Sequence, residues 1–213
     1  MSKSELRVHF VSKPIEVFTT ILDNHVEFNK YLKEVILEHR QNNPESNTSN
    51  VKAWHSEYLT HLENPKFQPL IDEVMGAIRF ISDGYYEEKN VHYEVINLWA
   101  MMYEDGEFTT RHNHWPCEFG VCYYVDVDPN CAPVIFESVQ NDGVNDKNKP
   151  LVIHPKNGML VIWPGILEHE VPSTTGKRMA VSMNIDKLYR GFNKNHIPPS
   201  YWKNSGMEEY GYR

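Results

Sequence analysis

Apolar residues at helical spacing mark the first part of the chain. A stripe at i, i+3, i+4, i+7 and i+8 runs from His25 to Arg40 and predicts an amphipathic helix. A second helix is expected from Phe67 to about Ser82, where Asp83-Gly84 ends it. The polar stretch 41–50 between them is expected to be an exposed loop. We expect both helices to act as scaffolding that covers one sheet.

The pattern changes to strands at Tyr93, where short runs of β-favouring residues alternate with breaks of Gly, Pro and Asn-Asp. We expect strands at 93–102, 119–127, 133–137, 151–154, 158–163, 168–171 and 179–185, and a short one near the start at 6–11. Many short strands separated in this way predict a mainly β fold with flanking helices, a two-sheet jelly roll or double-stranded β-helix.

Length and composition agree with one domain over residues 1–213. The chain is 40% hydrophobic and 12% aromatic, which is ordinary for a globular protein of this size. Residues 1–90 are expected to give helical N-terminal support, 91–187 the jelly-roll core and 188–213 a C-terminal tail. The hydrophilic segment 138–150 is expected to be a long loop of the kind that often forms lids or binding loops.

The charge and the cysteine content limit the cellular compartment and the classes of binding partner that we expect. The net charge of -8 argues against binding nucleic acid by phosphate neutralisation. No window reaches the ~18–20 apolar residues of a membrane span, and the first residues lack the apolar region of a secretory signal. Cys117, Cys122 and Cys131 are an odd number without paired spacing, so we expect no disulfide framework. We expect a cytoplasmic protein and infer no oligomeric state.

Three histidines give the main chemical signal. His112 and His114 are separated by one residue, and His169 follows 55 residues after His114. Side chains at i and i+2 of a β-strand point to the same face. A His-x-His on a strand would therefore aim two imidazoles at one point, and a third from a distant strand could close a metal site. The other eight histidines show no spacing that indicates a metal.

Arg178 lies nine residues after His169. A guanidinium near an open metal site can hold a carboxylate beside the metal, although a surface salt bridge is the alternative role. Ser182 would share the strand face of Arg178 and could add a hydrogen bond. Three facial ligands with free positions, together with a carboxylate anchor, indicate non-haem Fe(II) oxygen chemistry.

The segments around these residues resemble a known family. Residues 103–114 resemble the Tyr-x-x-Gly-x-Phe-x-x-x-His-x-Asp segment of prolyl-hydroxylase-like 2-oxoglutarate/Fe(II) dioxygenases. The chain is most similar to the 2-oxoglutarate/Fe(II) oxygenases common in phage and bacteria. The segments that carry the second half of this resemblance are 120–125, 158–164, 169–172 and 176–184. The resemblance covers roughly residues 50 to 186.

This resemblance implies a site and an activity. His112, His114 and His169 would hold Fe(II), and 2-oxoglutarate would pair its far carboxylate with Arg178. Further residues expected to line the pocket are Asn97, Trp99 and Tyr103, on or just after the strand before the first ligand. The implied reaction is a hydroxylation in which dioxygen oxidatively decarboxylates 2-oxoglutarate. The primary substrate is left open between a protein side chain, a free amino acid, a nucleobase and another small molecule.

The chain departs from the family pattern at the second ligand, where most members carry Asp or Glu and this chain has His114. The replacement leaves the site one unit more positive. His114 could ligate in a three-His site, as in some cupins, or Glu118 or water could take the position, because His112-x-His114-x-x-x-Glu118 also resembles the first cupin motif. We prefer His114, since its spacing from His112 matches the carboxylate that it replaces.

Other chemistries stay open beside this one. Iron is the preferred metal, but imidazole sites also suit Zn, Cu or Ni. A cupin-type dioxygenase that does not use 2-oxoglutarate, such as a thiol dioxygenase, would also use three His and an Arg. A non-catalytic jelly-roll binding module is the third possibility.

Overall fold

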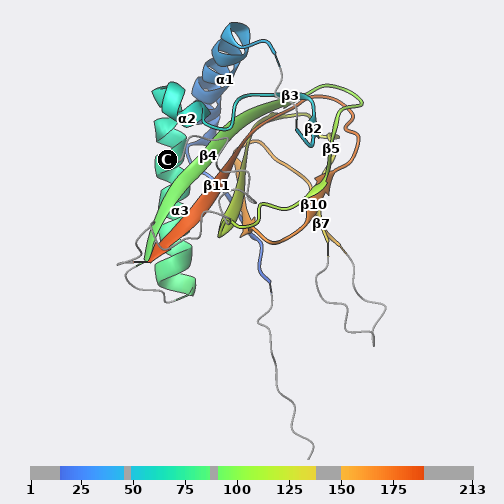
Figure 1. Cartoon of the computed structure of the whole chain (residues 1–213). Helices are drawn as coiled ribbons and strands as arrows, with labels where there is room; N and C mark the ends of the chain where they lie inside the picture. Colours follow the sequence, from blue (N-terminus) through green and yellow to red (C-terminus); the bar gives the residue numbers. More distant parts are fainter. Residues whose placement is uncertain (1–14, 46–48, 87–90, 138–149, 190–213) are drawn as a thin grey trace, which may run out of the picture.

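Two antiparallel sheets form the centre of the protein, and helices pack on one of them (Figure 1). The computed structural model describes residues 15–45, 49–86, 91–137 and 150–189. The expected strand 6–11, nearly all of the expected loop 138–150 and the tail 190–213 lie outside the described residues. The helical elements are α1 (His25–Asn42), α2 (Thr60–Glu63), η1 (Pro65–Phe67), α3 (Gln68–Phe80) and η2 (Ile81–Tyr85).

Each sheet is built from strands of distant parts of the chain. The six-stranded sheet has the order β1 (Phe18–Ile21), β9 (Met159–Pro164), β6 (Phe119–Val127), β11 (Arg178–Tyr189), β4 (Val91–Tyr103) and β3 (Trp54–His55). The five-stranded sheet has the order β2 (Val51–Lys52), β5 (Phe108–His112), β10 (His169–Val171), β7 (Val134–Phe136) and β8 (Leu151–Ile153). Apart from the pairs β3–β4 and β7–β8, successive strands alternate between the sheets, and the double-stranded β-helix expected from the sequence is confirmed.

The central strands of the larger sheet are buried on both faces. In β4, Leu98 and Ala100 point toward the helices, whereas Trp99 and Met101 belong to the cluster between the sheets. The same alternation continues along β6 and β11, because successive side chains of a strand point to opposite faces. The apolar stripes of α1 and α3 supply the other half of the first cluster. The helices thus cover one face of this sheet, as expected, and leave its opposite face to form a cleft with the smaller sheet.

The observed elements correct several details of the expected ones. The second helix ends at Phe80 and continues as a single π-helical turn through Tyr85. Strand β11 extends to Tyr189, beyond the expected end at 185, because it pairs with β4 along its whole length. Strands β1, β2 and β3 lie at sheet edges and were not anticipated. No helix within the described ranges has the length and apolar character needed to cross a membrane.

Gly120 of β6 leaves room for the ring of Trp163, its register partner on the neighbouring strand β9. A Cβ at this position would lie 2.5 Å from Cε2 and 2.6 Å from Nε1 of Trp163, whose ring is only 2% exposed and cannot move aside. We therefore expect Gly120→Ala to lower the free energy of unfolding by about 1–3 kcal/mol, the usual cost of overpacking. Urea unfolding measures this change.

Gly76 provides the matched control for that substitution. It lies in α3, and a Cβ there would meet nothing within 4 Å. Gly76→Ala should stabilise the protein by about 0.5–1 kcal/mol, because alanine loses less backbone entropy in a helix. Equal unfolding free energies for the wild type and Gly120→Ala would contradict the packing described for Trp163.

Candidate active site

His112 and His169 face each other across a pair of strands. His112 ends β5, His169 begins β10, and the two residues are paired in register. His114 is not on a strand. The expectation that strand alternation aims its side chain at the same point as that of His112 is therefore wrong. β5 ends at His112, and His114 lies in the loop that follows, where its backbone N–H donates to the Gly165 carbonyl at 2.7 Å. A long-range backbone contact, rather than strand alternation, brings His114 to the other two.

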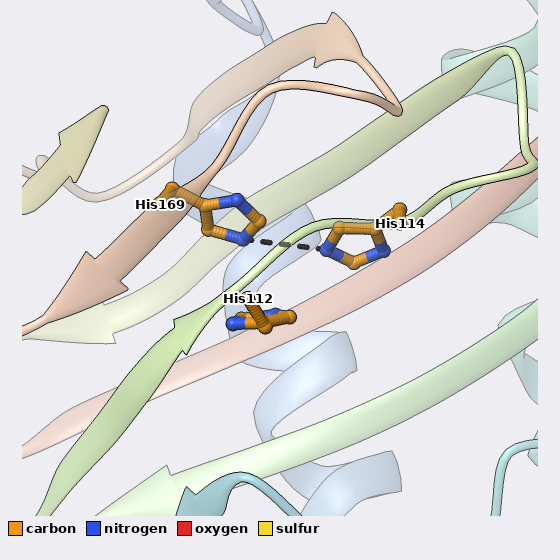
Figure 2. Close-up of side chains that lie close together, drawn as sticks. All are labelled: His112, His114 and His169. Carbon is orange, nitrogen blue, oxygen red and sulfur yellow. Dashed lines mark hydrogen bonds between the residues drawn. The ribbon is translucent and has the colours of Figure 1, made fainter. Parts of the chain in front are cut away.

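The three imidazoles nevertheless converge on one point (Figure 2). Their possible ligand atoms all lie within 4.8 Å of one another, and they form the one such group found among the described residues. The Nε2 atoms of His114 and His169 are 3.3 Å apart, the contact drawn as a dashed line. His112 is half-buried, whereas His114 and His169 are buried.

Each imidazole is oriented by a hydrogen bond at its other ring nitrogen. Nδ1 of His112 contacts the Thr110 carbonyl oxygen at 2.9 Å, and Nδ1 of His169 contacts the Leu167 carbonyl oxygen at 3.1 Å. A carbonyl oxygen only accepts, so Nδ1 carries the proton and Nε2 carries a lone pair. Such hydrogen bonds fix the tautomer and ring orientation of metal-binding histidines.

His114 is also oriented by a hydrogen bond at Nδ1, in this case to a side chain. Its Nδ1 contacts the carboxamide oxygen of Asn184, and Nδ2 of Asn184 donates to Oδ1 of Asn97 at 3.1 Å. Both asparagines lie on the central strands β11 and β4, where they are register partners. With protons on Nδ1, the Nε2 atoms of His114 and His169 place two lone pairs 3.3 Å apart, an arrangement that a cation between them would satisfy.

Burial keeps these imidazoles uncharged. Desolvation lowers the pKa of His114 to about 3, with the neighbouring His112 and hydrogen bonding at Asn184 as lesser influences. The pKa values of His112 and His169 are lowered for the same main reason. Neutral imidazole is the form that binds a metal, so all three rings are ready to ligate at neutral pH.

A column of stacked rings holds His114 from both faces. His55 stacks on Trp99, Trp99 stacks on His114 and His114 stacks on His169, with centroid separations of 5.8, 5.8 and 5.0 Å. Trp163 packs edge-on against both His114 and His169. This aromatic wall restricts ring rotation and excludes water on that side of the three histidines.

Arg178 is a buried cation with unused donors. Its side chain is 3% exposed, its Nη2 donates to the Tyr124 hydroxyl at 3.0 Å, and its Nε and Nη1 have no partner. The guanidinium also lies over the rings of Tyr103 and Tyr124, at 5.2 and 5.1 Å from their centroids. Burial favours the neutral form, but Tyr124, Tyr103, Cys122 and Cys131 together act in the opposite direction, and the pKa of Arg178 is raised. A charged group with two unpaired N–H donors in a buried site calls for an anionic partner.

All of these groups line one cleft between the sheets, with a volume of about 210 Å³. The residues singled out from the sequence that line it are Asn97, Trp99, Tyr103, His112, His114, His169, Arg178 and Ser182. Glu118, the alternative third ligand, is outside this lining and outside the histidine group. Its carboxylate lies 3.7 Å from Nζ of Lys187. The geometry therefore brings together three imidazoles and Arg178, and leaves Glu118 apart.

Sequence reasoning did not assign roles to three residues of this cleft. Asn184 orients His114, Tyr124 binds Arg178, and Trp163 packs on two of the histidines. The spacing Arg178–Ser182–Asn184 carried a signal, because residues at even separations on one strand share a face. The sequence gave no such signal for a role of Tyr124 or Trp163 in the cleft, because both look like ordinary aromatic residues of a hydrophobic core.

The comparisons with known proteins agree with this geometry. Residues 97–186, which contain the three histidines and Arg178, match the family described as "Putative 2OG-Fe(II) oxygenase". No curated protein matches the sequence.

Solved structures of 2-oxoglutarate-dependent enzymes share the fold. The carbocyclase SnoK from nogalamycin biosynthesis has a TM-score of 0.64 and 10% identity over 85% of each chain. A prolyl hydroxylase from Trichoplax adhaerens, in complex with a hypoxia inducible factor peptide fragment, has a TM-score of 0.60 and 17% identity over 79% of this chain and 83% of that one. HygX from Streptomyces hygroscopicus, with nickel and 2-oxoglutarate bound, has a TM-score of 0.54 and 8% identity over 81% of this chain and 82% of that one.

At these identities the solved structures establish the fold alone, and the family match covers the segment that carries the cleft. The resemblance read from the sequence motifs is thereby confirmed. The family match over residues 97–186, together with the fold and the three-His group, indicates a 2-oxoglutarate- and Fe(II)-dependent oxygenase, an oxidoreductase that uses iron, 2-oxoglutarate and dioxygen.

Proposed function

We propose that this oxygenase is a hydroxylase in which His112, His114 and His169 hold Fe(II) and Arg178 binds the far carboxylate of 2-oxoglutarate. One observation carries the proposal. The cleft that contains three convergent, neutral imidazoles also contains a buried guanidinium with two unpaired N–H groups. A metal site and a carboxylate site in the same enclosed space are what a keto diacid bound at iron requires.

The donor set fits an iron centre. Three neutral imidazoles with oriented Nε2 lone pairs can ligate a divalent first-row metal and leave positions open for other ligands. When bound, iron and 2-oxoglutarate together supply the oxidising power that removes a hydrogen from the substrate. The protein contributes orientation and a water-poor cleft, through the ring column beside His114 and the buried strand face around Arg178.

The chain's own groups also fix the direction of 2-oxoglutarate. The unpartnered Nη1 and Nε of Arg178 can donate hydrogen bonds to a carboxylate, while the bond from Nη2 to the Tyr124 hydroxyl holds the guanidinium in place. Ser182 lies on the same strand face, beside Cys122 in the register of β6 and β11, and would donate a further hydrogen bond to the bound acid. Asn97, Trp99 and Tyr103 would form the wall against which it lies.

The primary substrate enters from the open side of the cleft. Trp115, 64% exposed, and Tyr58 line the cleft near its rim, so the substrate group that reaches the metal would pass between aromatic side chains. Among the solved structures with this fold, the Trichoplax adhaerens enzyme is in complex with a peptide fragment and HygX has hygromycin B bound. The buried, unpaired thiols of Cys117, Cys122 and Cys131 fit a protein that works in a reducing cytoplasm.

Succinate release tests the proposed reaction class. The Fe(II)-loaded protein incubated with 2-oxoglutarate and dioxygen should form succinate in amounts that depend on all three. Oxygen consumption on addition of a thiol without succinate formation would instead favour the cupin-type dioxygenase. Binding of neither metal nor 2-oxoglutarate would favour the non-catalytic module.

Iron binding is expected to depend on the two strand-borne histidines. His112→Ala and His169→Ala should each lose stoichiometric iron, because each breaks the strand-paired set of Nε2 donors on which the rest of the site is built. Metal analysis after gel filtration measures the ratio of iron to protein. His61→Ala is the matched control, since His61 lies outside the cleft and the histidine group. Retention of one iron per chain in both cleft variants would reject the assignment.

The position of His114 is tested by three variants. His114→Asp should keep iron, because it restores the carboxylate usual in the family. His114→Ala should weaken iron binding without abolishing it, since two ligands and water remain. Glu118→Ala should leave iron affinity unchanged, because Glu118 lies beside Lys187 and outside the cleft lining. A larger loss in Glu118→Ala than in His114→Ala would support the cupin-like ligand set.

Binding of 2-oxoglutarate should depend on Arg178. Arg178→Ala is expected to weaken it by at least about 2 kcal/mol, roughly thirtyfold, because a buried carboxylate loses a charged bidentate partner. Calorimetric titration of the metal-loaded protein measures the affinity. Arg111→Ala is the control, since Arg111 is about half-exposed and pairs with Glu137 and Glu170 on the surface. Equal affinities in Arg178→Ala and wild type would remove Arg178 from the site.

A further inference from the structure

The metal ligands of this chain carry no negative charge. Most family members provide one carboxylate among three ligands, whereas the three candidate ligands here, His112, His114 and His169, are all histidines, which bind a metal as neutral imidazoles. The side chain that orients His114 is also neutral, because Asn184 offers a carboxamide rather than a carboxylate. The ligands would therefore neutralise neither of the two positive charges of a divalent metal bound here.

The rest of the cleft does not compensate for that charge. Among the described residues that line it there is no Asp or Glu, and Arg178 adds a further positive charge. On the proposed function, the two negative charges of 2-oxoglutarate oppose two charges of Fe(II) and one of Arg178. One positive charge is left in a buried site, where an unpaired charge is costly.

A hydrogen-bond donor without a partner lies beside the same histidines. Trp163 is only 2% exposed, and its buried Nε1 makes no hydrogen bond. The indole lies over Gly120 and packs against His114 and His169, with centroid separations of 5.4 and 4.8 Å. Buried N–H groups are nearly always paired in proteins, so an unpaired one in a residue that lines the cleft calls for an acceptor.

We propose that the three-His centre has an additional site for one monovalent anion, which receives a hydrogen bond from Nε1 of Trp163 and balances the charge left by His114. This inference rests on the proposed function, because the charge count includes 2-oxoglutarate. The anion is a halide or the carboxylate of the primary substrate, and both offer the same chemistry to the indole N–H. A carboxylate would make the primary substrate an organic acid or an acidic residue.

The experiment uses the full-length protein loaded with Co(II) and saturating 2-oxoglutarate in chloride-free buffer. Stoichiometric binding of both is established first. Azide, chloride and acetate are then titrated separately, and the visible absorption of Co(II) gives a dissociation constant for each. The wild type should bind one anion per chain in a saturable manner. Tighter binding of acetate than of chloride assigns the site to a substrate carboxylate, and the reverse order assigns it to a halide.

Two variants and one control connect the effect to the named residues. Trp163→Phe keeps a ring in place and removes the N–H, so each anion should bind at least about fivefold more weakly. His114→Asp supplies the missing negative charge and should abolish saturable anion binding. Trp54→Phe makes the same chemical change outside the cleft, where Nε1 donates to the Asn43 carbonyl oxygen at 3.1 Å, and should bind anions like the wild type.

The outcomes separate this inference from the proposed function. Anion binding that is absent, or equal in wild type and Trp163→Phe, overturns the anion site while bound Co(II) and 2-oxoglutarate leave the proposed function standing. Competition between the anion and 2-oxoglutarate also overturns it, because the anion would then occupy the cosubstrate position. Failure to bind Co(II) and 2-oxoglutarate contradicts both.

Discussion

Pairing of buried polar groups governs the cleft between the two sheets. A polar atom that is buried away from water needs a hydrogen-bond partner or an ion. In this cleft the chain supplies a partner for only some of the nitrogen atoms of each imidazole and of the Arg178 guanidinium. The histidines are satisfied at Nδ1 and left open at Nε2, and Arg178 is satisfied at Nη2 and left open at Nε and Nη1. The residues that carry these open atoms all line the same cleft. The fold thus prepares two incomplete sites, one that a cation completes and one that a carboxylate completes.

The need to place polar groups in the cleft determines which positions of the central strands are polar. β4, β6 and β11 bury one face against the helices and use the other for chemistry, so polar residues such as Ser182 and Asn184 recur at even separations among apolar ones. The helices contribute nothing to the cleft lining, but they make the chemical face possible by covering the opposite one. Substitutions on the helix-facing side would therefore act on the site through strand position rather than by contact.

Local patterns predicted much of this structure, because periodicity reports which face of an element is buried. The two long helices, the strands from β4 onward except β5, and eight of the cleft residues followed from such patterns and from the family motifs. The placement of His114 did not, because a backbone hydrogen bond to Gly165, 51 residues away, sets it and strand alternation does not. The edge strands β2 and β3 have two residues each, too few for a period to appear. The roles of Tyr124 and Trp163 depend on neighbours from other strands, and a core aromatic looks the same in the sequence whether or not it borders a cleft.

The central claim is that one cleft joins a three-His iron site to a 2-oxoglutarate site. Anaerobic titration of the protein with Fe(II) and 2-oxoglutarate tests it most directly, because chelation of the keto acid by the bound iron produces a visible charge-transfer band. The account predicts a band that saturates at one iron and one 2-oxoglutarate per chain. Tight binding of iron and of 2-oxoglutarate without any such band would place the two on separate sites and contradict the account.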